Sequence, residues 1–236
     1  EIGRPYIVHK TAINSPSSDF GVSFFGDKIV FASTRNSGKL YDWNNQPYLD
    51  LYEADLNEDN DLSNVTLFSS EINSKMHESN AVFTKDGKTM YFTRNNFIAG
   101  KKRRDQNKVT HLKIYKAFLN NGKWSNISEL PFNSDNFSVE HPALSPDEKQ
   151  LYFSSDMPGA IGSFDLFVVR INEDGTYGSP KNLGTEINTE QREQFPFVSN
   201  NNILYFASDG HFGLGGLDIF KSKISNRSFS EPINLS

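Results

Sequence analysis

One short pattern recurs four times along the chain and constrains the fold more than any other feature. Each copy contains a short apolar run, a turn rich in Asp, Asn, Gly and Lys, and a Phe that small residues follow. The copies align on Phe31, Phe92, Phe153 and Phe206, so the spacing is 61, 61 and 53 residues. Self-similarity at such a period indicates a repeat architecture.

Each repeat divides into four candidate strands. In the first, residues 21–24 and 29–32 flank a Gly-Asp-Lys turn, a pattern typical of a β-hairpin, and two further apolar segments follow at 49–54 and 65–68. No stretch shows helical periodicity. The repeats span about 19–73, 78–134, 140–188 and 193–235. Four short strands per unit predict an all-β fold, a β-propeller of four-stranded antiparallel blades.

The number of blades depends on the N-terminal segment. Residues 11–14 (Thr-Ala-Ile-Asn) resemble residues 185–188 (Thr-Glu-Ile-Asn), which end a later repeat, so residues 5–8 are expected to supply a closing outer strand. The first prediction is therefore five blades, the last incomplete here, with residues 1–236 forming one domain excised from a larger multidomain protein. The alternative is a ring of four blades with a loose N-terminal strand.

Composition excludes several kinds of site. The chain has no Cys, which excludes disulfides, Cys-ligated zinc and thiol nucleophiles. A net charge of −5 argues against nucleic acid as the main partner, and no run approaches the roughly 18 apolar residues of a membrane span. The five His residues lack metal-ligand spacing, and the acidic stretch 55–61 lacks the glycine of a calcium loop. We therefore expect no metal and no cofactor.

An acidic residue begins the innermost strand of every repeat: Asp19, Glu78, Glu140 and Glu193. Innermost strands line the central channel of a propeller, so equivalent positions would form a ring at one mouth. One hypothesis is that this ring binds a cation or a basic peptide segment. The preferred interpretation is structural, with each carboxylate accepting backbone N–H groups at a blade junction.

A second recurring acidic position precedes the third strand. Asp50, Asp165 and Asp218 occupy it, whereas the second repeat has Lys113. A catalytic or metal role would not tolerate Lys in a symmetric set, so these carboxylates are expected to fix the preceding loop by hydrogen bonds. The stretch 213–216 (Gly-Leu-Gly-Gly) precedes a strand rather than a helix and is predicted to be a turn, not a phosphate cradle.

Two long insertions carry candidate partner contacts. The insertion at 36–48 contains Tyr41, Trp43 and Tyr48, and exposed aromatics in a loop favour a contact surface, although they could instead fold back over the blade edge. The insertion in the second repeat contains Lys101, Lys102, Arg103 and Arg104. This basic run could bind an acidic partner or anionic lipid headgroups, but a solvated loop is the simpler interpretation.

The stretch 145–156 (Ser-Pro-Asp-Glu-Lys-Gln-Leu-Tyr-Phe-Ser-Ser-Asp) resembles the repeat of the TolB-type, WD40-like propeller family. Residues 141–147 (His-Pro-Ala-Leu-Ser-Pro-Asp), 156–159 (Asp-Met-Pro-Gly), 195–197 (Phe-Pro-Phe) and 208–220 resemble one subgroup. That subgroup is the propeller of OmpA-family, PorE-like outer-membrane lipoproteins of bacteria with type IX secretion. The resemblance covers nearly all of residues 14–235. It implies sister domains outside this chain, among them a peptidoglycan-binding one.

The resemblance predicts a non-catalytic protein-binding scaffold in the periplasm, associated with the outer membrane. Its partners would be other envelope or secretion-machinery proteins, and it would link a type IX secretion or gliding assembly to peptidoglycan through the sister domains. One alternative is a TolB-like module that binds a peptide at the channel mouth. Another is a propeller glycosidase, but a glycosidase needs unequal carboxylates, and the four acidic residues are expected to be equivalent. We therefore predict that the domain is not an enzyme.

Overall fold

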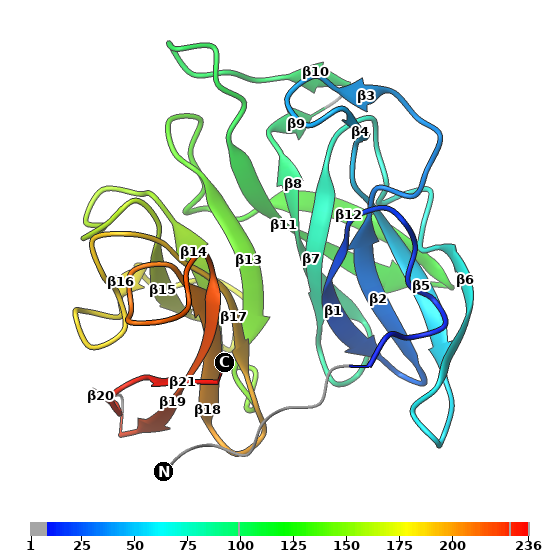
Figure 1. Ribbon diagram of the computed structural model, residues 1–236. Helices are drawn as coiled ribbons and strands as arrows, with labels where there is room; N and C mark the ends of the chain where they lie inside the picture. The colour runs from blue at the N-terminus through cyan, green and yellow to red at the C-terminus, as the bar shows by residue number, and fades with distance from the viewer. Residues whose placement is uncertain (1–8, 99, 227, 236) are drawn as a thin grey trace. The chain divides into compact units, whose positions relative to one another are not determined.

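The computed structural model describes residues 9–98, 100–226 and 228–235 (Figure 1). These residues form strands, turns and loops and contain no helix, which confirms the predicted all-β class. Within these ranges, accordingly, there is no helix long and apolar enough to cross a membrane.

Four antiparallel sheets follow one another along the chain, each built from one repeat (Figure 1). The first contains β1 (Asp19–Phe25), β2 (Lys28–Ser33), β5 (Asp50–Leu56) and β6 (Leu62–Leu67). The second contains β7 (Glu78–Phe83), β8 (Thr89–Asn95), β11 (Leu112–Asn120) and β12 (Lys123–Glu129). The third contains β13 (Val139–Leu144), β14 (Gln150–Ser155), β15 (Asp165–Arg170) and β16 (Lys181–Asn182). The fourth contains β17 (Glu193–Val198), β18 (Ile203–Ser208) and β19 (Asp218–Ser225), with β20 (Ser228–Phe229) and β21 (Ile233–Asn234) both paired to β19.

The sheets are the four blades of a β-propeller fold, as in the alternative prediction. The fifth blade depended on residues 5–8, which lie outside the described residues. Two compact units divide the chain: His9–Asn136 contains blades one and two, and the part from Phe137 contains blades three and four. That residues 1–236 form a single domain stays a prediction.

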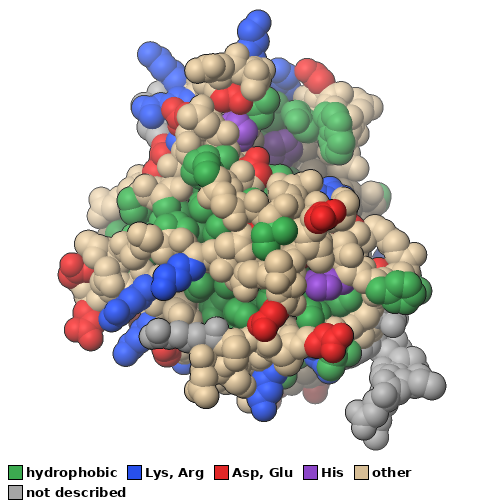
Figure 2. Space-filling model, turned by 90° about the vertical axis from the view of Figure 1, so that its left-hand side faces the viewer, with side chains coloured by type: hydrophobic (Ala, Val, Ile, Leu, Met, Phe, Trp, Pro, Cys, Tyr) green, Lys and Arg blue, Asp and Glu red, His purple; other side chains and the backbone are tan. Residues whose placement is uncertain are grey.

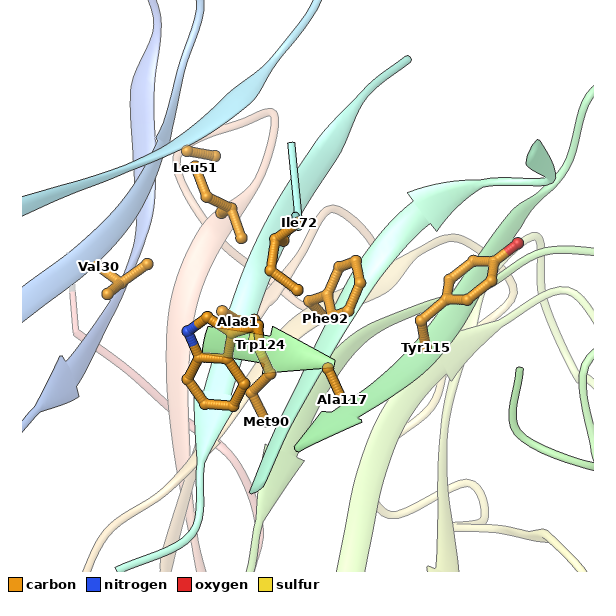
Figure 3. Packing of buried hydrophobic residues seen from close by; sticks show 10 residues of the cluster. Val30, Leu51, Ile72, Ala81, Met90, Phe92, Tyr115, Ala117 and Trp124 are labelled. Carbon is orange, nitrogen blue, oxygen red and sulfur yellow. The ribbon is translucent and has the colours of Figure 1, made fainter. Parts of the chain in front are cut away.

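Within each unit, neighbouring blades pack by the same pair of faces. We call the side of a blade that carries its repeat Phe the Phe face, and the other side the opposite face. Between blades one and two, Val30 and Leu51 on an opposite face meet Met90 and Phe92 on a Phe face (Figure 3). Burying such side chains contributes roughly 1.5–3 kcal/mol each. Because successive side chains of a strand point to opposite faces, apolar residues on both faces allow each blade to pack against a neighbour on either side.

Blades three and four repeat this packing. Tyr152 and Leu166 on the opposite face of blade three meet Leu204 and Phe206 on the Phe face of blade four. The repeat Phe is therefore a core residue in every blade, with an exposed fraction of at most 2%. This explains why the sequence repeats it so regularly.

The opposite face of blade four differs from its three counterparts. Leu51, Ile114 and Leu166 occupy equivalent positions on the third strands, and each is 0% exposed. Ile219, at that position in blade four, is 55% exposed. An aliphatic side chain at this position is thus buried in three blades and exposed in the fourth.

Every innermost strand carries a bulge next to its third residue, where the pairing register shifts. The bulged residues have left-handed backbone conformations: Gly21 (φ 67°), Asn80 (φ 42°), His141 (φ 57°) and Phe195 (φ 53°). Bulges of neighbouring blades lie close together within each unit. The rings of His141 and Phe195 stack with centroids 3.9 Å apart in blades three and four, and Gly21 lies against the Asn80 side chain in blades one and two. A bulge re-aims side chains at the edge of a sheet.

We expect Gly21→Ala to lower the free energy of unfolding by about 2 kcal/mol, because a Cβ there would lie 2.8 Å from Asn80 Nδ2 and because φ is positive. Gly26→Ala is the matched control. Its φ of 62° is similar, but nothing lies within 4 Å of the added Cβ, so a loss of about 1 kcal/mol is expected. Urea unfolding of both variants measures the difference, and equal losses would contradict close contact between the bulges.

Candidate functional site

The predicted equivalence of the four acidic residues holds for three of them. Asp19, Glu78 and Glu193 lie opposite Ser33, Arg94 and Ser208, each two residues after a repeat Phe. In blade three, this position is filled by Val139, which pairs with Ser155, whereas Glu140 pairs with Ser154. The predicted equivalence is therefore wrong for Glu140.

Turn length explains the error. Glu140 and Glu193 both lie 13 residues before their repeat Phe. Six residues separate the paired Leu144 and Leu151 in blade three, but only five separate Val198 and Leu204 in blade four. One extra turn residue shifts the register by one, and a one-residue shift moves a side chain to the other face of a strand.

The three equivalent carboxylates accept hydrogen bonds from the same place in their own repeat. Each binds the backbone N–H and the hydroxyl of the residue four positions earlier. Ser15 N, Ser74 N and Thr189 N lie 2.8, 2.9 and 2.8 Å from their carboxylate oxygens. The hydroxyl oxygens lie at 2.9, 2.6 and 2.8 Å. These are the contacts that the structural interpretation requires, and the binding of a cation or peptide at these residues stays a prediction.

A cationic side chain completes the arrangement in blades one and two. Arg35 Nη2 lies 2.8 Å from Asp19 Oδ1, and Arg94 Nε lies 2.7 Å from Glu78 Oε1. Burial by itself raises the pKa of Asp19, but hydrogen bonds from Arg35, Ser33 and Ser15 lower it to about 2. Each guanidinium also donates to the carbonyl of the Ile that precedes the blade, Ile13 or Ile72. The pairs therefore fasten each blade to the turn before it.

Glu140 has different surroundings. It is only 4% exposed, Gln194 Nε2 of blade four donates to Oε1 at 2.6 Å, and His141 Nδ1 lies 3.7 Å from the same oxygen. Burial raises the pKa of Glu140 to about 7, partly opposed by the Gln194 hydrogen bond. The carboxyl therefore joins blades three and four and is shielded from a substrate.

Glu140 makes stability depend on pH. Its pKa of about 7 in the folded chain lies above the ordinary 4.5, so folding favours the protonated form. The stabilisation is complete below about pH 4.5 and is lost as pH rises through about 7. We expect the melting temperature to fall from about pH 5 to about pH 8 and Glu140→Gln to reduce that fall. Thermal unfolding across this range tests it, with exposed Glu173→Gln as control; an unchanged slope in Glu140→Gln would contradict it.

The second recurring acidic position fixes loops, as predicted. Asp165 accepts from the N–H groups of Ile161 and Gly162 at 2.7 and 3.0 Å. Asp218 accepts from Leu214 and Gly215 at 2.6 and 3.1 Å, which makes the Gly-rich stretch 213–216 a turn closed on Asp218. Asp50 is bound by Asn36 Nδ2 at 2.7 Å.

The Lys that breaks this series has its own partners. Lys113 is 2% exposed, and its Nζ lies 2.8 Å from Glu129 and 2.6 Å from Asp135. Glu129 pairs with Tyr115 as Asn182 pairs with Phe167, and Asn182 binds Asp165 in blade three. Blade two thus carries the same contact between neighbouring strands with a cation on one strand and a carboxylate on the other.

The two insertions meet in one place. β3 (Leu40–Tyr41) and β4 (Gln46–Pro47) form a hairpin in the first, and β9 (Phe97–Ile98) and β10 (Lys101–Lys102) form one in the second (Figure 1). Lys102 Nζ lies 5.8 Å from the Tyr48 ring, within the range of a cation–π contact. We call this composite the aromatic–basic surface, formed by Tyr41, Trp43, Tyr48, His77, Lys101, Lys102, Arg103 and Arg104.

The aromatic residues of the aromatic–basic surface differ in how far they are packed against the protein. The rings of Tyr41 and Tyr48 pack on His77, with centroids 4.9 and 4.6 Å away, whereas Trp43 is 84% exposed. Tyr41 and Tyr48 thus fold back onto the protein and Trp43 does not, and contact of this loop with a partner stays a prediction. The basic side chains are exposed, and Figure 2 shows Lys and Arg side chains at the upper end of the molecule.

Sequence reasoning missed His77. Its Nδ1 accepts the Leu49 N–H at 3.1 Å, which places the ring proton on Nε2. Burial, with a smaller effect of Lys102, lowers its pKa to about 4, so the ring is neutral at physiological pH. No sequence spacing reveals this role, because Tyr41 and Tyr48 reach His77 only through the fold. Among the residues described, no cluster of three or more His, Asp or Glu could hold a metal.

Comparison with known proteins finds matches among solved structures. No protein-family model and no curated protein sequence matches the chain. A protein described as TolB from Agrobacterium tumefaciens has a similar structure, with a TM-score of 0.56 and 16% identity over 96% of this chain and 67% of that one. An alpha-L-arabinofuranosidase from Lactobacillus brevis gives 0.54 and 10%, covering 92% of this chain and 72% of that one.

A third similar structure is an exo-beta-1,3-galactanase from Clostridium thermocellum, with a TM-score of 0.53 and 13% identity over 95% of this chain. The chain spans 50% of that enzyme's length. These identities show the fold alone, a TolB-like β-propeller. Because the same fold occurs in two glycosidases, the function has to be argued from this chain's own residues.

Proposed function

We propose that this domain is a non-catalytic, protein-binding module of the periplasm that docks a partner on its aromatic–basic surface. The observation that carries the proposal is the meeting of the two insertions, which presents Trp43 and four exposed basic side chains on one surface. Exposed aromatic and Arg side chains are the residues that most often dominate binding energy in protein interfaces.

The hydrogen bonds and burial of the four acidic residues support a non-catalytic role. Asp19, Glu78 and Glu193 are held by the same donors of their own repeats, and Glu140 is buried against Gln194. A glycosidase needs an accessible acid and base in different environments on either side of one bond. We therefore expect no hydrolysis on a panel of glycosides, and hydrolysis that Glu140→Gln abolishes would overturn this part of the proposal.

The wider role rests on the resemblance of the repeat motifs. We propose that the parent protein is an OmpA-family, outer-membrane-associated protein. The propeller would then bind an envelope or secretion-machinery protein while sister domains contact peptidoglycan. Type IX secretion or gliding is the process that this resemblance favours.

Site-specific photo-crosslinking in the native cells tests the proposal. Benzoylphenylalanine in place of Trp43 should crosslink to one envelope protein. The same residue in place of Phe212, which is 99% exposed on another loop, should not. Equal crosslinking from both positions, or none from Trp43, would overturn docking on the aromatic–basic surface.

A further inference from the structure

The aromatic–basic surface has a charge opposite to that of the chain as a whole. The segments 36–48 and 97–104 together contain five basic residues and one acidic residue, whereas the whole chain has a net charge of −5. Among the described residues, no ion pair involves Lys101, Lys102, Arg103 or Arg104. Their cationic groups therefore make no direct salt bridge to a carboxylate within the part of the chain that the structure describes.

The aromatic–basic surface also presents an exposed aromatic side chain, Trp43, beside rings that are packed against one another. Tyr41 and Tyr48 lie with ring centroids 5.4 Å apart and both pack on His77, which the Leu49 N–H holds in place. Trp43 lies in the loop that β3 and β4 enclose and stays 84% exposed. Because the supporting rings are already packed, binding at Trp43 would require little ordering of the surface.

The contacts favour a protein segment over a membrane. Stable interfacial binding to lipid requires a broad apolar face. In the β3–β4 hairpin only Leu40, Tyr41 and Trp43 are exposed large hydrophobic residues, and exposed basic side chains lie beside them. The β3–β4 and β9–β10 hairpins are two-stranded, and neither has a third strand within the described part of the chain. Hairpin edges of this kind can pair with an extended peptide.

We infer that the aromatic–basic surface binds an extended acidic segment of a partner protein that places an aromatic or aliphatic side chain on Trp43. This inference rests on the proposed function and specifies its partner. Carboxylates of the segment would pair with the basic side chains around β10, where charge-assisted hydrogen bonds are stronger than neutral ones. The apolar side chain would cover the exposed indole.

Fluorescence anisotropy with a labelled peptide, Glu-Glu-Leu-Glu-Phe-Glu-Glu, tests the inference on the purified protein. Exchanging every Glu of the peptide for Gln, or Leu and Phe for Gly, should each weaken binding about tenfold or more. Binding should also weaken between about 50 and 300 mM salt, because exposed charges are screened.

Variants of the protein locate the site. Trp43→Ala and the quadruple change Lys101→Ser, Lys102→Ser, Arg103→Ser and Arg104→Ser should each raise Kd about tenfold or more. Two controls should leave Kd within about twofold: Phe212→Ala, and Lys221→Ser combined with Lys223→Ser, since these residues lie on blade four and its loop. Circular dichroism verifies that each variant is folded.

Three outcomes would overturn the inference: no peptide binding, binding that neither surface variant weakens, or binding that the Gln peptide retains. Sedimentation with phosphatidylcholine–phosphatidylglycerol vesicles is a further experiment. If the protein binds vesicles but not the peptide, and the surface variants abolish vesicle binding, the site would be assigned to anionic lipid instead. If Trp43 photo-crosslinks to a protein but the peptide fails to bind, the proposed function stands and only the acidic chemistry of the partner falls.

Discussion

Arg94→Ala should lower the free energy of unfolding by about 3–5 kcal/mol, the largest effect that we expect from one substitution. Glu78 is 0% exposed, and the change would leave its carboxylate with only the Ser74 donors. It would also remove the donor to the Ile72 carbonyl and the guanidinium that lies 4.9 Å from the Phe92 ring. Urea unfolding measures the loss.

Arg192→Ala is the matched control for charge. Arg192 pairs with Asp209 at 2.6 Å, but its side chain is 49% exposed, so a loss below about 1 kcal/mol is expected. Replacing both partners by apolar side chains avoids an uncompensated buried charge, and blade three already has Val139 at the position of the carboxylate. We expect Glu78→Val with Arg94→Met to be more stable than Arg94→Ala alone. A loss below about 1 kcal/mol in Arg94→Ala would contradict a structural role of the pair.

Leu166→Ala and Ile219→Ala should differ although they change equivalent positions. Leu166 is 0% exposed between blades three and four, and its truncation should cost about 3 kcal/mol through lost burial and a cavity. Ile219 is 55% exposed, so its truncation should cost less than about 1 kcal/mol. Urea midpoints of the two variants give the comparison.

Leu51→Ala and Ile114→Ala extend the test, because both residues are 0% exposed and should behave like Leu166. If Ile219→Ala is as destabilising as these three, the opposite face of blade four is covered in solution. That result would contradict the exposure on which the comparison rests.

The repeated carboxylates stabilise the fold, whereas the two insertions carry side chains that are available for binding. Asp19, Glu78 and Glu193 repeat one set of hydrogen bonds, as a structural element repeated with the fold would. Trp43 and the basic run occur once each and lie in insertions that the repeat does not need. Single, exposed features on a repeated scaffold are where function is expected.

Several parts of the structure could be predicted from single residues. Each repeat Phe was assigned to a predicted strand, and Phe31, Phe92, Phe153 and Phe206 are all core residues. Asp165 and Asp218 were predicted to fix loops, and they do so through backbone N–H groups three and four positions before them. Glu140 was placed wrongly, because register follows turn length as well as distance from the repeat Phe.

The sequence by itself determined the all-β class, the four repeats and the strands within them, but it left open whether the ring has four or five blades. These depend on local alternation and turn chemistry, which repeat with the chain. Only the tertiary structure decided that residues 36–48 and 101–104 form one surface, that His77 supports it, and that Ile219 is exposed where Leu166 is buried. Such contacts join residues far apart in the chain, and a side chain's burial is set by what packs against it rather than by its own chemistry.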